Sequence, residues 1–126
     1  MANMADHAKQ VGILKQHVID LLGLDQSAGK SILLGETNIS HMMSRHPRDY
    51  ELYGQCISEI LSEPDYVALS EKDGSIEYVK EMQLDTIYVK VAVRVSLKGQ
   101  LYVRSLYRLN VNRVKNFIEK GTLKSY

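Results

Sequence analysis

The chain has 126 residues, one cysteine and a formal net charge of +1. A domain of this length buries enough surface to fold without a metal or a disulfide, and one cysteine cannot form an internal bridge. The sequence has neither a secretory signal pattern nor an apolar run long enough to cross a membrane. We therefore expect a single cytoplasmic domain over residues 1–126, with residues 1–8 frayed and no cofactor.

Charge is distributed unevenly along the chain. Residues 1–85 carry 7 Lys or Arg against 14 Asp or Glu, whereas residues 86–126 carry 9 against 1. Segregated positive charge favours an anionic partner, with nucleic acid as the leading candidate, although like charges can also cover an ordinary solvated surface. The last third is therefore a candidate nucleic-acid-binding module.

The first third of the chain reads as a helix followed by a turn and a short strand. Apolar residues three and four apart predict a helix over Ala5–Leu22, ended by Gly23. The next loop has five residues between its glycines where a phosphate-binding loop requires four, and a helix precedes it where that motif needs a strand. We interpret this loop as a turn. The apolar run Ile32–Leu34, ended by Gly35, is either a small strand or a hydrophobic lead-in to the next helix.

Two further helices are predicted on either side of a proline. Thr37 or Asn38 can cap a helix holding Ile39–Arg45, and Pro47 prevents its continuation because proline lacks a backbone N–H. A longer helix follows over Arg48–Ser62, and Cys56 lies on its apolar stripe as a core residue rather than a nucleophile.

Beyond Pro64 the hydrophobic period changes from helical to two, which indicates strands. The clearest case is Thr86–Val95, where every odd position from Ile87 onward is Ile or Val. A C-terminal helix capped by Asn110 and ended by Gly121 completes an α+β domain in which helices precede a four-stranded antiparallel meander. The four predicted strands are Tyr66–Ser70, Ile76–Met82, Thr86–Val95 and Leu101–Arg108.

The last two strands carry a basic face. Pairing Leu97 with Leu101 and Val95 with Val103 keeps the apolar sets together. This register places Arg94 opposite Arg104 and Lys90 opposite Arg108. Like charges directly opposite each other destabilise a strand pair by about 0.2–1 kcal/mol, so the presence of two such pairs on one face requires an explanation. Either it is simply solvated or neutralised by Glu77 and Glu81, or it binds the phosphates and bases of a nucleic acid. The substrate-binding candidates are Lys90, Arg94, Arg104, Arg108, Tyr88 and Tyr102.

The segment from His41 to Pro47 is the densest in proton-transfer groups. His41 and Arg45 share a helical face, while His46 lies at the break before the proline. Imidazoles can exchange protons at neutral pH and a guanidinium can hold a phosphoryl oxygen, although both histidines could equally be structural. The two imidazoles are too far apart around a helix to share an ion and no acidic ligand accompanies them, so we expect no metal site.

Ser105 is the remaining candidate. It falls on the apolar face of its strand, opposite Val93 in the predicted register, where its hydroxyl needs a hydrogen-bond partner. It either bonds to the backbone or faces a reacting phosphate. No general base accompanies it in the sequence, which excludes a hydrolase triad.

These residues together resemble a known family. His41-x-x-x-Arg45-His46-Pro47, the Pro64-Asp65 that ends a helix, and Ser105 late in a strand pair are similar to the phage-associated barnase, EndoU, colicin and RelE-like (PBECR) nuclease domains. The resemblance covers residues 31–123. It implies a barnase/RelE-like α+β fold and metal-independent RNA cleavage by acid-base chemistry, and it assigns catalytic positions to His41, Arg45, His46 and Ser105.

The resemblance also implies a biological context. Family domains are toxins carried by phages or mobile elements, so we expect RNA as the substrate, a cognate immunity or antitoxin protein as a partner, and no membrane association. Two other functions stay open from the sequence. The basic face could serve a non-catalytic regulator that binds nucleic acid or an acidic protein, or exposed tyrosines could make the domain a protein-interaction module.

Overall fold

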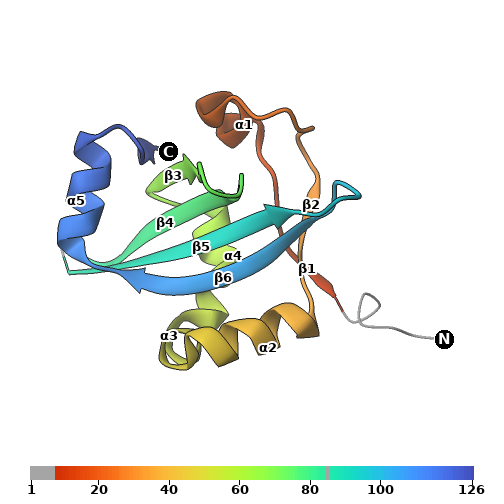
Figure 1. Ribbon diagram of the computed structural model, residues 1–126, viewed down its shortest axis with the longest axis horizontal. Helices are drawn as coiled ribbons and strands as arrows, with labels where there is room; N and C mark the ends of the chain where they lie inside the picture. The colour runs from red at the N-terminus through yellow and green to blue at the C-terminus, as the bar shows by residue number, and fades with distance from the viewer. Residues whose placement is uncertain (1–7, 85) are drawn as a thin grey trace.

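The computed structural model describes residues 8–84 and 86–126, and it is an α+β domain built on a mixed seven-stranded sheet (Figure 1). The α+β class is confirmed, but the four-stranded meander is wrong in extent. The strands are β1 (Lys9–Ile13), β2 (Ser31–Leu34), β3 (Tyr66–Leu69), β4 (Ile76–Gln83), β5 (Ile87–Val95), β6 (Leu101–Leu109) and β7 (Lys124–Ser125). The expected meander β3 to β6 is extended by β2 and β1 beyond β6 and by β7 beyond β3. β2 pairs parallel to β6 and every other pair is antiparallel.

The predicted N-terminal helix is wrong over its first half. Residues 9–13 form β1, which pairs with β2, and the helix α1 spans only Gln16–Leu22 before Gly23 takes a left-handed conformation. Val11 and Ile13 alternate as a strand requires, while Val11 and Leu14 are also spaced as on a helix. The rest of the predicted helix, residues 5–7, lies outside the described residues, as does most of the segment expected to be frayed.

The helices around Pro47 differ from the predicted ones: the first begins earlier, and the second is divided. α2 (Glu36–Arg45) begins after Gly35, whose N–H donates to the Asn38 side chain at 2.8 Å, so Asn38 lies in the first turn rather than at the cap. The predicted helix over residues 48–62 is divided into α3 (Pro47–Tyr53), the 3₁₀ helix η2 (Gly54–Cys56) and α4 (Ile57–Ser62). Gly54 is a weak helix former, and a Cβ there would lie 2.9 Å from the Tyr50 ring.

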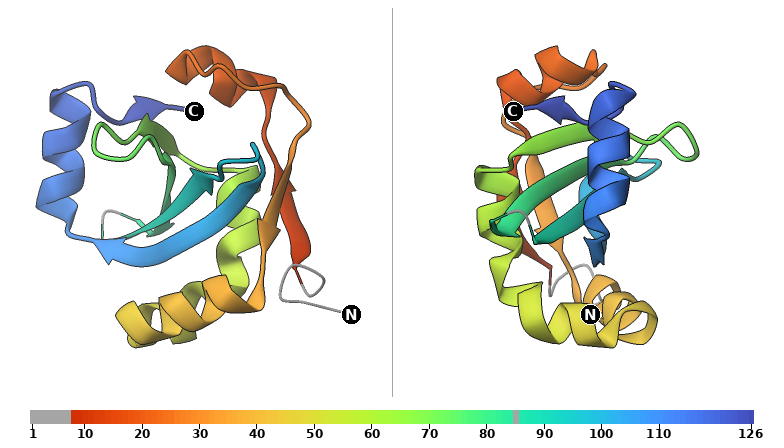
Figure 2. Two further views of the ribbon diagram at one scale, coloured as in Figure 1. Left: turned by 45° about the vertical axis from the view of Figure 1, so that its right-hand side comes forward. Right: turned by 90° about the vertical axis from the view of Figure 1, so that its left-hand side faces the viewer.

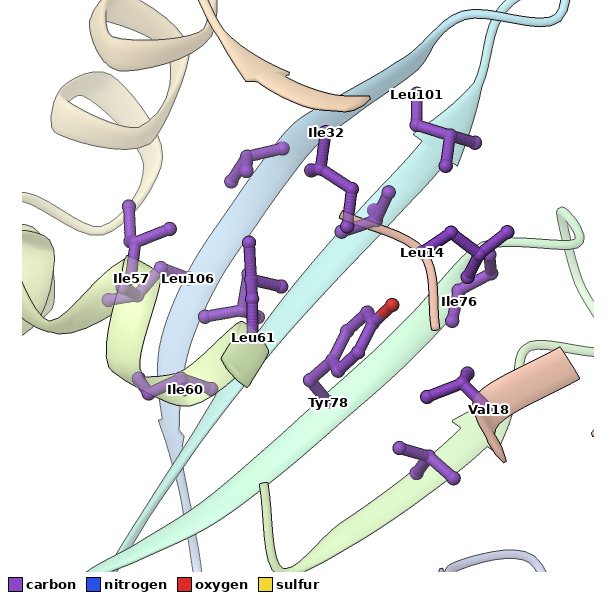
Figure 3. Close-up of a cluster of buried hydrophobic side chains, with 14 of the residues drawn as sticks. Leu14, Val18, Ile32, Ile57, Ile60, Leu61, Ile76, Tyr78, Leu101 and Leu106 are labelled. Atoms are coloured by element: carbon purple, nitrogen blue, oxygen red, sulfur yellow. The ribbon is translucent and has the colours of Figure 1, made fainter. Parts of the chain in front are cut away.

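The sheet is covered on both faces. α4 packs on one face and α5 (Val111–Glu119) on the other, as the two turned views show (Figure 2). On the α4 side, Ile60 and Leu61 meet the fully buried Tyr78 of β4 (Figure 3). On the α5 side, Val114 packs in a smaller cluster with Ala68, Val79, Tyr88, Leu109 and Leu123.

The C-terminal helix forms as predicted. The Asn110 side chain accepts a hydrogen bond of 2.8 Å from the N–H of Asn112, which caps α5, and Gly121 follows the helix with a positive φ of 78°. No helix among residues 8–84 and 86–126 is long and apolar enough to span a membrane.

The register between β5 and β6 differs from the predicted one. Val95 pairs with Leu101 and Val93 with Val103, and then a β-bulge leaves Arg104 as an extra residue, so that Ala92 pairs with Ser105. Leu97, expected to pair with Leu101, lies in the turn and is fully exposed. The predicted like-charge pairs do not form, because Arg94 lies opposite Tyr102 and Lys90 opposite Tyr107.

Candidate functional site

A groove of about 890 Å³ lies on the sheet face that α5 partly covers. Its walls come from α2, from the turn between β3 and β4, from β4 to β6 and from α5. The structure brings four of the residues singled out in the sequence, from segments about 60 positions apart, to this one groove: His41, Arg45, His46 and Ser105. Lys90 and Arg104 line it as well.

α2 presents His41 and Arg45 to the groove. They are one turn apart on the helix, and Met42 beside them is fully buried and fixes the rotation of α2 against the core. Both side chains are exposed, and neither forms a hydrogen bond or an ion pair with any other described residue. Their polar groups are therefore available to a ligand.

His46 is held more firmly than His41. It ends α2 by donating its N–H to the Met42 carbonyl at 2.8 Å, and its own carbonyl accepts from Tyr50 in α3 at 3.0 Å. The following proline disfavours helical geometry at His46, which explains its φ of −139°. The imidazole lies against the ring of Tyr107, with the centroids 4.8 Å apart. This side chain is half-buried and its position is defined by two elements.

Ser105 reaches the groove because of the bulge. In a regular strand it would share a face with Leu101 and Val103, which are both fully buried in the core. The extra residue Arg104 turns Ser105 to the opposite face, beside Ala92, and bulges often reorient side chains in this way next to functional sites. The expected burial on the apolar face is thus wrong, and the hydroxyl makes no hydrogen bond to another described residue.

Two of the groove's cations are already paired with carboxylates. Lys90 and Glu77 form an ion pair of 3.0 Å whose side chains are only 14% and 19% exposed, and the Lys90 ammonium also lies over the Tyr107 ring at 4.8 Å. Burial opposes the charge on Lys90, but Tyr107 and Glu77 outweigh it and raise the pKa of this ammonium. Glu77 therefore neutralises part of the predicted basic face.

The second pair joins Arg104 to Asp73 in the turn between β3 and β4. The Asp73 carboxylate also accepts from the backbone N–H of Ser75 at 3.0 Å. This backbone hydrogen bond, with a further contribution from Arg104, lowers the pKa of Asp73 to about 2. Asp73 is therefore ionised at neutral pH and occupies the guanidinium that a substrate phosphate would otherwise meet.

Other cations in the groove are free of such pairing. Arg45, Arg113 and Lys120 form no ion pair with any described residue, and the Arg113 guanidinium lies over the Phe117 ring at 5.5 Å. The groove remains positive in total, because its Lys and Arg side chains are Arg45, Lys72, Lys90, Arg104, Arg113 and Lys120, against Glu71, Asp73 and Glu77. An anionic ligand is favoured here.

Four of the predicted substrate-binding residues lie outside this groove. Tyr88 is 7% exposed beneath α5 and donates to Glu81 at 2.8 Å. Arg108 is paired with Asp49 of α3 at 2.6 Å. Arg94 and Tyr102 line an adjoining hollow at the β5–β6 hairpin. The structure thus does not gather the six predicted substrate-binding residues into one surface.

The sequence prediction missed Tyr107, which contacts both His46 and Lys90. With strict alternation along β6, Tyr107 falls on the core side, whereas after the bulge it lines the groove. The sequence does contain a signal for the bulge. The apolar residues that the core buries, Leu101, Val103 and Leu106, are two and then three positions apart. A step of three inside an alternating strand is typical of an inserted residue.

The assembled groups can perform proton transfer beside a bound anion. Two imidazoles, an unpaired guanidinium and a hydroxyl face one positive groove. Among residues 8–84 and 86–126, no cluster of three or more His, Cys, Asp or Glu side chains is placed to hold a metal ion.

Comparison with known proteins finds one matching family. The family model described as phage-Barnase-EndoU-ColicinE5/D-RelE like nuclease3 (PBECR3) matches residues 8–116, a range that includes β1 and α1 as well as the groove's α2, β5 and β6. No curated protein and no solved structure gives a significant match to the chain.

Proposed function

Since this chain belongs to the phage-Barnase-EndoU-ColicinE5/D-RelE like nuclease3 family, we propose that it is a nuclease that cleaves RNA in the groove between α2 and α5. The observation that carries the proposal is the convergence of His41, Arg45, His46 and Ser105 on that groove. Structural histidines on a helix would not need to meet a hydroxyl from a strand about 60 residues later.

The chemistry that suits these groups is transfer of the phosphate to the ribose 2′-oxygen. One imidazole takes the proton of the 2′-hydroxyl, whose oxygen attacks phosphorus, and the bond from phosphorus to the 5′-oxygen breaks. The other imidazole, in its protonated form, gives that leaving oxygen a proton. The products are a 2′,3′-cyclic phosphate and a 5′-hydroxyl.

The remaining groups would stabilise the charge that develops on the phosphate. Arg45 shares the groove-facing side of α2 with His41, so its guanidinium can hold a non-bridging oxygen. The Ser105 hydroxyl can donate to the same phosphate from the strand side. Arg113 and Lys120 on the α5 side can hold neighbouring phosphates, because neither is committed to a carboxylate among the described residues.

The test of this function compares an RNA oligonucleotide with its 2′-O-methyl counterpart, in EDTA. We expect the RNA to be cut to fragments with cyclic phosphate ends, and the methylated strand to stay intact because its 2′-oxygen cannot be deprotonated. If well-folded protein cuts neither strand the enzymatic proposal fails, and if it cuts both equally the 2′-hydroxyl is not the nucleophile.

A competing function is a non-catalytic regulator that binds an RNA or an acidic protein. It is favoured by the two ion pairs that occupy Lys90 and Arg104, since a groove selected only for RNA cleavage gains nothing from them. Salt-dependent RNA binding without cleavage, retained by His41→Gln and His46→Gln but lost in Arg94→Gln, would support the regulator over the nuclease.

We propose further that the nuclease is a phage-borne toxin, a role partly implied by its family name, and that a cognate immunity protein controls it. Induced expression in bacteria should arrest growth with loss of RNA integrity, and the His41→Gln variant should not. Growth arrest by both forms would show that toxicity does not arise from groove chemistry.

A further inference from the structure

A second hollow adjoins the groove at the β5–β6 hairpin. It has a volume of about 520 Å³ and shares His41 and Arg104 with the groove, so the two are continuous. The first turns of α2 form one side and the end of the hairpin forms the other. A strand whose scissile phosphate lies beside His41 therefore has its next nucleotide within reach of this hollow.

Two polar side chains of the hollow, Asn38 and Ser96, each accept a backbone N–H through their oxygen and can donate a hydrogen bond to a ligand. The Asn38 Oδ1 accepts the Gly35 N–H at 2.8 Å, which fixes the amide orientation and leaves its NH₂ group free. The Ser96 Oγ accepts the Gln100 N–H at 3.1 Å, which leaves its O–H to donate. At these two side chains, a ligand that presents an oxygen or nitrogen acceptor is therefore a better match than one that presents an amino group.

The rest of the lining suits a nucleobase. Tyr102 is half-buried and provides a ring on which a base can stack, and the fully exposed Leu97 provides an apolar edge. Arg94 is exposed and forms no ion pair with a described residue, so its guanidinium can donate to a base or to the following phosphate.

We propose that this hollow binds the base next to the cleaved bond and selects keto bases, uracil and guanine, over the amino bases cytosine and adenine. The inference rests on the proposed RNA substrate. Uracil presents the O4 acceptor where cytosine presents an N4 amino group, and guanine presents O6 where adenine presents an N6 amino group. An amino group facing the donors of Asn38 and Ser96 leaves them unpaired, and this mismatch disfavours binding.

The direct experiment measures affinity without cleavage. Fluorescence-labelled 2′-O-methyl oligomers of uracil and of cytosine, which differ at each base in the keto or amino group and the ring protonation that goes with it, are titrated with the wild-type protein. We expect uracil to bind about tenfold more tightly than cytosine, the discrimination typical of one matched polar contact. Equal affinity for the two oligomers overturns the proposal.

The Asn38→Asp variant tests the donor directly. An aspartate keeps the oxygen that accepts from Gly35 but replaces the free NH₂ with an acceptor, so the preference should move toward cytosine by tenfold or more. The matched control is Asn116→Asp on α5, which adds the same charge at an exposed position outside both hollows and should leave the preference unchanged. A loss of affinity in Asn38→Asp that is equal for the two oligomers contradicts the assignment.

These outcomes are separable from those of the nuclease proposal. Cleavage of RNA without a preference for uracil would refute the proposed base site but not the proposed nuclease activity. If the protein never cuts RNA but prefers uracil, and Asn38→Asp changes that preference, the base site is supported and the nuclease proposal is refuted.

Discussion

Replacing Asp73 with asparagine should destabilise the protein at neutral pH and much less in acid. The folded protein lowers the pKa of Asp73 from 3.8 to about 2, chiefly through the Ser75 N–H and in part through Arg104. At about 1.4 kcal/mol per pKa unit this shift sets an upper limit of roughly 2.5 kcal/mol. The side chain is 33% exposed and asparagine can still accept from Ser75, so with solvent screening we expect about 1 kcal/mol.

The direction of the pKa shift determines how the contribution of Asp73 to stability changes with pH. The folded pKa lies below the unfolded one, so the contribution is complete above pH 3.8 and is lost as the pH falls toward 2. Urea unfolding followed by circular dichroism should give the largest difference between Asp73→Asn and wild type at pH 7, and a difference that narrows steadily below pH 4. Glu119→Gln, which removes an exposed carboxylate of α5 that has no ion pair with a described residue, should show neither effect. A difference that is equal at pH 7 and at the lowest pH where the protein stays folded would refute the reasoning.

Three further predictions concern the groove and the core. Arg113→Gln should lower the slope of log affinity for RNA against log salt by about 0.7, the value for one contact to a single strand, whereas Arg108→Gln, paired with Asp49 outside the groove, should not change it; equal slopes would remove Arg113 from the binding surface. Tyr107→Leu should slow RNA cleavage by about tenfold, because it removes the aromatic ring that contacts both His46 and Lys90, whereas Tyr107→Phe should cleave at the wild-type rate. Slow cleavage by both variants would show that the Tyr107 hydroxyl matters rather than the ring. Ile60→Ala should lower the free energy of unfolding by about 2–5 kcal/mol, measured in urea, since Ile60 is fully buried between α4 and the sheet, and a loss below 1 kcal/mol would contradict that packing.

The central strands and the last helix could be predicted because one local signal decided each of them. β5 has a face of Ile and Val at every second position, and Asn110 and Gly121 mark the limits of α5. β1 could not be predicted in this way. Val11 fits both a helix with Leu14 and a strand with Ile13, and the choice depends on pairing with β2, which lies about 20 residues away.

The sequence predicted several of the residues that line the candidate site but not the ion pairs within it. Because Pro47 ends α2, the sequence predicted that His41 and Arg45 lie on this helix and that His46 lies at its end. The ion pairs of Lys90 with Glu77 and of Arg104 with Asp73 depend on the β-bulge and on the turn between β3 and β4. The alternation of apolar and polar residues along a strand predicts neither feature. The predicted basic face is therefore partly neutralised, and the groove cations without an ion pair to a described residue include Arg45 of α2 and Arg113 of α5.

The most direct test of the central claim is the rate at which one defined RNA is cleaved by the wild type, by His41→Gln and by His46→Gln, in EDTA at neutral pH. His17→Gln is the control, because that imidazole packs against Tyr126 and does not line the groove. We predict a loss of about 10²–10⁴-fold for each groove histidine and none for the control. Wild-type rates in both groove variants, from folded protein, would contradict the account.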